Sequence, residues 1–254
     1  PMRCHGALRR CFLVADGSQP TDSPSRVPRT VPAKHALAWF GEAMRLWKRS
    51  PVVFCLQAFV ILLVTVTFEP VPVLGFVAAN VVAPLLSCGL LYSSLAADRN
   101  GKARMVHLFA VFAAPLRAQS AAVAAGLAVL VAESAAAWAL GDVNLLLPVP
   151  DAANLSPQVI IGIYAVGVVA SLPVTFVPMA ALFDGEDVRA AFALSWRAFA
   201  ANVPAFLALA AYSFVLLMLG LATTGVGLVL ALPWIAAASY AAWKDIFGLA
   251  QLRL

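Results

Sequence analysis

Six apolar runs, each close to or above the length needed to cross a membrane, dominate this sequence. They lie at about 51–69, 71–96, 119–140, 158–183, 203–220 and 222–242. An α-helix rises about 1.5 Å per residue, so about 20 apolar residues cross a hydrocarbon core about 30 Å thick. The sequence therefore predicts an all-α polytopic membrane protein with six transmembrane helices.

The composition excludes a water-soluble globular domain. Hydrophobic residues make up 63% of the chain and charged residues 11%, whereas a soluble domain has about 45–50% apolar and about 25% charged residues. Such a chain has too little polar surface to cover an exterior that faces water. The net charge of +5 does not indicate a nucleic-acid partner, because the basic residues lie at the ends of the apolar runs, where they orient membrane helices.

The distribution of basic residues predicts the orientation of the helices. The segment before the first run carries nine Lys and Arg residues, the loops at 97–118 and 184–202 carry four and two, and the segment after the last run carries two. The loops on the opposite side of the membrane contain no Lys or Arg, and their charged residues are Glu69, Asp142 and Asp151. Because loops rich in Lys and Arg stay in the cytoplasm, we expect both termini on the cytoplasmic side.

Each cytoplasmic segment before an odd-numbered run has the pattern of an amphipathic helix. In KHALAWFGEAMRLWKRSPVVF (34–54) apolar and basic residues occupy opposite sides of a helical wheel, and the helix is expected to end at Ser50-Pro51. DVRAAFALSWRAFAANVPAFLAL (187–209) matches it closely, and ARMVHLFAVFAAPLRAQSAAV (103–123) is a looser copy that Pro115 interrupts. We expect three helices in the headgroup region, with basic groups facing anionic lipid.

The even-numbered runs also end alike, in AADRNG (96–101), LFDGED (182–187) and WKDIFG (243–248). This periodicity predicts three copies of one unit, an interfacial helix followed by a transmembrane hairpin, around a pseudo-threefold axis normal to the membrane.

The predicted domain organisation follows from these patterns. Residues 1–30 are rich in Ser, Pro and Thr and are expected to form a disordered cytoplasmic tail. A membrane domain is expected over 31–248, followed by a cytoplasmic tail at 249–254. The three repeats are placed at about 34–98, 103–184 and 187–245.

The stretches VPAKHALAWFGEAMRLWKRSP (31–51) and GLATTGVGLVLALPWIAAASYAAWKDIFG (220–248) resemble a family of uncharacterised bacterial inner-membrane proteins. In that family a Val-Pro-Ala start precedes a Trp-containing amphipathic helix, and an Ala-Ser-Tyr-x-x-aromatic-basic-Asp-(Ile/Val)-Phe motif follows the last helix. The similarity covers about residues 31–248. It implies a six-helix protein of the bacterial inner membrane, and it implies no known activity, catalytic residue or cofactor.

Few polar residues interrupt the apolar runs, and Glu133 in LAVLVAESAAAWAL (127–140) is the most unusual. An ionisable group in hydrocarbon is unfavourable, which makes it a candidate functional residue. Asn80 is expected at a similar depth on a neighbouring helix, where a hydrogen bond to Glu133 would lower the cost of burial. Thr175 and Tyr212 are the other polar groups available to line a binding site. Three hypotheses for Glu133 follow: it is a structural residue, a proton or substrate site, or a contact to a partner protein.

Aromatic and basic residues are predicted to mark the cytoplasmic interface of the bilayer. Trp prefers the headgroup region, and Lys and Arg attract anionic lipids, which are expected partners. The predicted lipid-interface residues are Trp39, Arg45, Trp47, Lys48, Arg49, Trp196, Arg197 and Trp243.

No motif in the sequence indicates catalysis, since HExxH, GxSxG, P-loop and dinucleotide-binding glycine patterns are all missing. Cys4, His5 and Cys11 lack a fourth ligand for zinc, and no His falls inside an apolar run, where it could bind haem. We therefore expect a protein that is not an enzyme and that needs no metal or cofactor.

The sequence favours an accessory subunit of a larger membrane complex or a membrane scaffold, because intramembrane polar groups are few and the long apolar helices offer surfaces to partners. The alternative is a small-molecule or ion transporter or channel, in which Glu133 is the coupling or binding carboxylate. A third hypothesis is lipid sensing by the interfacial helices, which predicts binding to anionic vesicles that weakens as salt is added.

Overall fold

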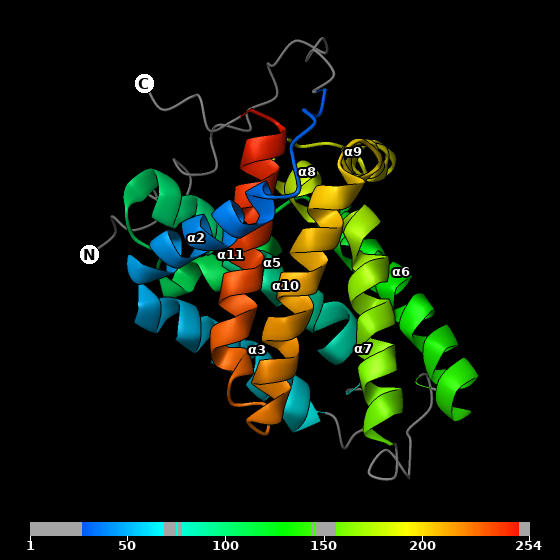
Figure 1. Ribbon diagram of the computed structural model, residues 1–254. Coiled ribbons are helices and arrows are strands. Elements are labelled where there is room, and N and C mark those ends of the chain that lie inside the picture. Colours follow the sequence, from blue (N-terminus) through cyan, green and yellow to red (C-terminus); the bar gives the residue numbers. More distant parts are fainter. Residues whose placement is uncertain (1–26, 69–74, 76–77, 144, 146–155, 249–254) are drawn as a thin grey trace.

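The structure is a computed structural model that describes residues 27–68, 75, 78–143, 145 and 156–248 (Figure 1). Every regular element in these ranges is a helix, which confirms the predicted all-α class. Residues 1–26 of the tail predicted at 1–30, and the whole tail predicted at 249–254, lie outside the described residues.

The first part of the chain forms α2 (His35–Lys48) and α3 (Pro51–Phe68), which meet at an angle of 101°. The bend falls at the predicted Ser50-Pro51 boundary, where proline has no N–H to donate and begins the next helix. A short π-helix, η2 (Ala78–Val82), then leads into α5 (Ala83–Asn100). This helix ends at Gly101, whose left-handed φ of 76° is the usual conformation for a residue that follows a helix.

The second part begins with a 3₁₀ helix, η3 (Met105–Ala113), which stops before Pro115 as the sequence predicts. Two long helices follow, α6 (Leu116–Gly141) and α7 (Pro157–Ser171). The chain continues through the 3₁₀ turn η5 (Leu172–Val174) into α8 (Val177–Phe183), so prolines near both junctions divide the predicted fourth span.

The third part contains α9 (Val188–Ala201), α10 (Val203–Ala222) and α11 (Leu228–Ile246). The Asp187 carboxylate caps α9 by accepting the Ala190 N–H at 2.7 Å. A tight turn joins α10 to α11, and Gly225 adopts a φ of 85° within it.

Four helical segments are long and apolar enough to cross a membrane: Ala78–Asn100, Leu116–Gly141, Pro157–Phe183 and Val203–Ala222. The bent pair formed by α2 and α3 adds a fifth if it is counted as one span. α11, the helix of the predicted sixth run, is not among the segments that are long and apolar enough to cross a membrane. It carries Lys244 and Asp245 in its last turn. Length and composition therefore support four to five of the six predicted spans.

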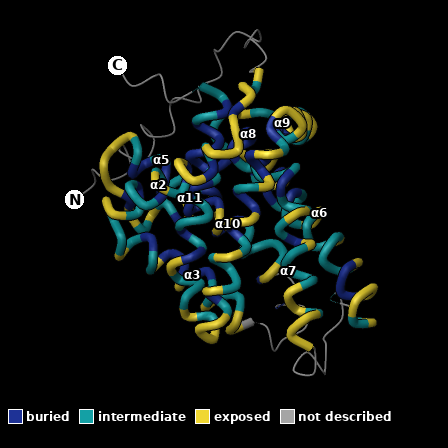
Figure 2. The backbone as a smooth tube through the Cα atoms, in the orientation of Figure 1, coloured by how far each residue is buried: buried dark blue, intermediate teal, exposed yellow. Residues whose placement is uncertain are grey.

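The shorter helices α2, η3 and α9 each pack mainly on a longer or neighbouring helix, and only for α2 is that helix distant in sequence. α2 lies against α11, η3 against α5, and α9 against α8. The largest buried cluster unites side chains of α2, α5, α10 and α11, and Figure 2 shows this concentration of buried residues. α7 packs mainly on α6, whereas α6 also contacts α8, α5, η2 and α9; we call α6 and α7 the α6–α7 arm.

The structure corrects the boundary of the predicted disordered tail, because residues 27–30 are ordered. The Arg29 N–H donates to the Ile246 carbonyl at 2.8 Å, and the Asn202 side chain donates to the Arg29 carbonyl at 2.9 Å. Asn202 also accepts the Val31 N–H at 2.7 Å. These contacts hold the chain before α2 against the end of α11.

Candidate functional site

A group of buried and half-buried charged side chains joins α2, α5 and α11. Lys244 Nζ lies 2.6 Å from Asp98 Oδ2 and 3.5 Å from Glu42 Oε1. Arg45 donates to both oxygens of Glu42 and lies 3.2 Å from Asp98 Oδ1, and the Tyr240 hydroxyl donates to Asp98 Oδ2 at 3.1 Å. We call Glu42, Arg45, Asp98, Tyr240 and Lys244 the ionic cluster.

The ionic cluster contains two acids and two bases, so its charges compensate one another. Hydrogen bonding from Arg45 lowers the pKa of Glu42 to about 2 against the opposing effect of burial, and Lys244 contributes in the same direction. Burial lowers the pKa of Lys244, and the Glu42 carboxylate opposes this shift by favouring the charged ammonium. Because each carboxylate already has a cationic partner, the cluster provides a structural link rather than a free acid or base.

A second polar group surrounds Asp245 at the end of α11. Its carboxylate accepts hydrogen bonds from Arg29 at 2.6 Å and the Trp39 indole at 3.0 Å, and it lies 2.7 Å from His35 Nδ1. Burial would raise the pKa of Asp245, but the hydrogen bonds from His35 and Trp39 and the charge of Arg29 keep it below its usual value. Asp245 thus fixes both the start of α2 and the chain before it.

Uncharged polar side chains connect α3 to α5 and to the segment before η3. Gln57 is fully buried; its oxygen accepts the Ser93 hydroxyl at 2.8 Å and its amide donates to the Arg104 carbonyl at 3.0 Å. Ser50 Oγ accepts the Ala103 N–H at 3.0 Å. These bonds hold the α2–α3 bend next to the turn that follows α5.

The structure distributes the residues predicted to bind a substrate over several elements. Glu133 is half-buried in α6, and a side-chain carbon added to Gly167 of α7 would overlap its carboxylate. The Thr175 hydroxyl donates to the Ser171 carbonyl at 2.8 Å, between η5 and α8. Tyr212 in α10 is 43% exposed, and its ring packs edge-on against Phe40 of α2.

Glu133, Thr175 and Tyr212 therefore each have a different neighbour, and no described contact joins two of the three. Asn80 lies half-buried in η2, which packs on α6. The structure places Gly167 of the same arm against the Glu133 carboxylate, and the predicted hydrogen bond from Asn80 to Glu133 stays a prediction.

The predicted lipid-interface residues separate into buried and exposed groups. Trp39 and Trp243 differ from the prediction, because they are only 3% and 4% exposed. Trp39 bonds to Asp245, and Trp243 packs against aromatic rings of α8 and the end of α11. Arg45 belongs to the ionic cluster, and Trp47 is half-buried. The exposed members of the predicted set are Lys48, Arg49, Trp196 and Arg197.

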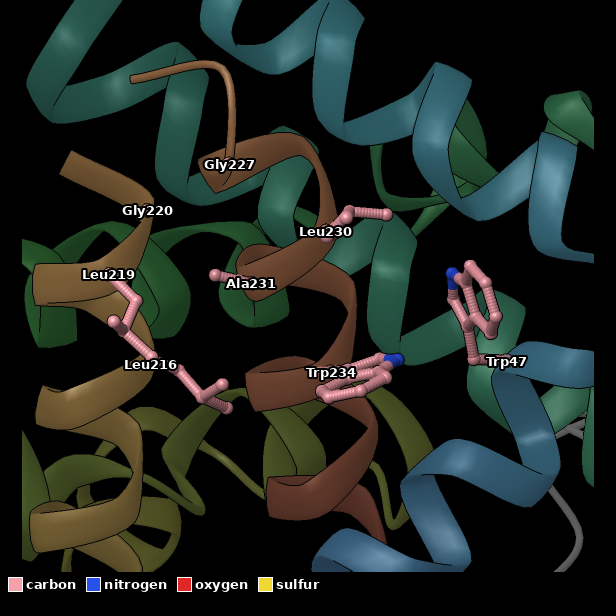
Figure 3. A pocket seen from close by; sticks show the side chains of 8 residues that line it. All are labelled: Trp47, Leu216, Leu219, Gly220, Gly227, Leu230, Ala231 and Trp234. Carbon is pink, nitrogen blue, oxygen red and sulfur yellow. The ribbon is translucent and has the colours of Figure 1, made fainter. Parts of the chain in front are cut away.

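An apolar pocket of about 270 Å³ lies between α10, α11 and the end of α2 (Figure 3). The Trp47 and Trp234 rings line it and meet edge to face, with centroids 6.2 Å apart. Their buried indole nitrogens have no hydrogen-bond partner among the described residues. Such a lining suits a hydrocarbon group better than a polar substrate. The lining residues are Trp47, Leu216, Leu219, Gly220, Gly227, Leu230, Ala231 and Trp234.

Within the described ranges no group of three His, Cys, Asp or Glu side chains could hold a metal ion. Cys55 and Cys88 are free thiols there, while Cys4, His5 and Cys11 lie outside those ranges.

Sequence reasoning missed the polar residues that join the helices, among them Glu42, Asp98 and Lys244. One signal was available, because AADRNG and WKDIFG place Asp98 and Asp245 at matching positions. An acid recurring at the end of an apolar run also predicts that each copy needs a cationic partner nearby.

We compared the chain with known protein families, curated proteins and solved structures, and none of the three comparisons gave a match.

Proposed function

We propose that this protein is a non-catalytic component of the bacterial inner membrane, serving as an accessory or scaffolding subunit of a larger membrane complex. The observation that carries the proposal is the exposure of the α6–α7 arm. In the most apolar stretch of α6 only 11% of the residues are buried, and in that of the α7–α8 segment 17% are buried. The corresponding share is 50% for the segment that contains α5. A helix pair covered so little by its own chain offers a long surface for transmembrane helices of a partner.

The proposal includes six spans arranged as three hairpins, each preceded by an interfacial helix. Its support is the cyclic packing of α2 on α11, η3 on α5 and α9 on α8, in which each short helix contacts the last helix of another hairpin. The three hairpins also end in glycines of nearly equal φ, namely 76° at Gly101, 73° at Gly185 and 70° at Gly248.

The proposed orientation places both ends of the membrane domain in the cytoplasm. Arg29 bonds to Asp245 and Ile246, so the two ends of the described chain lie together, as an even number of spans requires. All 17 Lys and Arg residues fall on the same side of the predicted spans, which favours the cytoplasm for that side.

The alternative transporter function requires the intramembrane polar groups to converge on a hydrated path. Glu133, Thr175 and Tyr212 have separate neighbours, and this separation favours the accessory role.

The test is purification from native membranes in mild detergent, followed by mass measurement of the intact assembly. We expect a stoichiometric complex heavier than the chain alone. Val169→Trp in α7 should weaken the complex by disturbing the arm surface. Val215→Trp in α10 is the matched control, because Val169 and Val215 are 56% and 55% exposed.

A monomer or a small homo-oligomer, or equal effects of the two Trp variants, would contradict the accessory role. Proton-coupled uptake into vesicles, with Glu133→Gln as the test variant, would then examine the transporter function.

A further inference from the structure

We propose that the cytoplasmic ends of α2 and α5, with the turn that follows α5, form a binding site for the headgroup phosphate of an anionic phospholipid. The inference rests on the membrane location in the proposed function and is independent of any partner complex. The site consists of five exposed basic residues, which we call the basic junction: Lys48, Arg49, Arg99, Lys102 and Arg104.

Hydrogen bonds bring the two sequence segments of the basic junction together. Arg49 donates to the carbonyls of Ala97 and Asp98 at the end of α5. The hydrogen bonds from the Ala103 N–H to Ser50 and from the Gln57 amide to the Arg104 carbonyl then hold the turn after α5 against the α2–α3 bend. The backbone that carries the five basic residues is thus fixed by the fold, and a ligand would not have to order it.

The acids nearest the basic junction are already paired. Glu42 and Asp98 are bound by Arg45 and Lys244 within the ionic cluster. Over the described ranges, none of the five basic residues forms a salt bridge with an acidic side chain. Like charges held close together repel one another, so an external anion that binds between them is stabilised.

Exposed apolar residues beside the basic junction indicate a lipid rather than a soluble anion. Val52 at the start of α3 is 75% exposed, and Val106 and Phe109 of η3 are 49% and 54% exposed. A phospholipid offers phosphate to the basic residues and acyl chains to these apolar side chains.

The experiment measures binding of a short-chain phosphatidylglycerol to the purified full chain in neutral detergent, by native mass spectrometry. Phosphatidylcholine of the same chain length is the neutral comparison, and we expect it to bind more weakly. Lys48→Gln, Lys102→Gln and Arg104→Gln in one variant should lower the affinity for phosphatidylglycerol by about 100-fold, since each basic residue near a surface contributes about a fivefold factor.

The matched control is a triple variant with the same loss of charge at exposed positions elsewhere, Lys34→Gln, Arg117→Gln and Arg189→Gln. It should retain the affinity of the unmodified protein. Equal losses in the two variants would show diffuse attraction and overturn the proposal.

Equal binding of the two lipids would also overturn the proposal. So would displacement of phosphatidylglycerol by inorganic phosphate at matched ionic strength, because it would indicate a site for a free anion. Thermal unfolding of both variants checks that each is folded. Because the experiment uses the isolated chain, its failure is distinct from failure to find a partner complex.

Discussion

Lys244 Nζ lies 2.6 Å from Asp98 Oδ2, and this ion pair joins α11 to α5 across 146 positions of sequence. The two side chains are only 10% and 6% exposed. Removing two charges from water is unfavourable unless further polar partners complete the arrangement. Here Arg45, Glu42 and Tyr240 supply them, so a compensated cluster links the first and last parts of the chain.

Replacement of Lys244 by Met should lower the free energy of unfolding by about 3 kcal/mol, because it leaves Asp98 buried with less positive charge. Arg45 and Tyr240 remain as partners of Asp98, which places the loss at the low end for a broken buried pair. Denaturant titration in detergent measures the effect. Lys34→Met, at an exposed lysine, should change stability by less than about 0.5 kcal/mol. Equal effects of the two changes would mean that the buried pair does not contribute.

Glu42 makes the stability of the protein depend on pH in acid. Its pKa falls from 4.5 to about 2 in the folded state, so the unfolded chain binds the proton more tightly. The stabilisation is fully present above about pH 4.5 and is lost as the pH falls towards about 2. The difference in unfolding free energy between the unmodified protein and Glu42→Gln should therefore shrink over this range. A difference that stays constant with pH would contradict the proposed pairing with Arg45.

Local signals account for the parts of the fold that the sequence predicts well. Apolar runs and prolines act on their immediate neighbours, and α3 accordingly begins at Pro51 and η3 stops before Pro115. The pairing of Arg29 with Asp245 joins positions 216 apart, and neither residue has a local pattern that identifies the other.

In the candidate site, too, local sequence signals do not identify which distant residues come into contact. Rise per residue predicts the depth of Glu133, but it does not predict which neighbouring helix its side chain faces. The structure places Gly167 there, because glycine lets the α6 carboxylate approach the α7 backbone. Similarly, the preference of Trp for the headgroup region predicts an interface position for Trp39, whereas the acceptor supplied by Asp245 allows it to be buried.

Asn202 should be required for order in the chain before α2. It is 1% exposed, accepts the Val31 N–H, and donates to the carbonyls of Arg29 and Ala198. Asn202→Ala leaves these backbone groups without their partner, so we expect a loss of about 1–3 kcal/mol and faster hydrogen exchange at Val31. The control is Asn100→Ala, at the exposed end of α5. Unchanged exchange at Val31 would show that Asn202 does not hold this segment.

Gly167→Ala tests the contact within the α6–α7 arm. A methyl group at Gly167 would overlap the Glu133 carboxylate, so the carboxylate or the helix must move, and we expect a loss of about 1–3 kcal/mol. Glu133→Ala removes the overlapping atoms, and the double variant should therefore recover most of the loss caused by Gly167→Ala alone. At Gly41 on the exposed side of α2, nothing lies within 4 Å of an added carbon, so Gly41→Ala should be neutral or stabilising by up to about 1 kcal/mol. If the effect of Gly167→Ala were the same with and without the Glu133 carboxylate, the two residues would not be in contact, and Glu133 would have to face another part of the membrane domain.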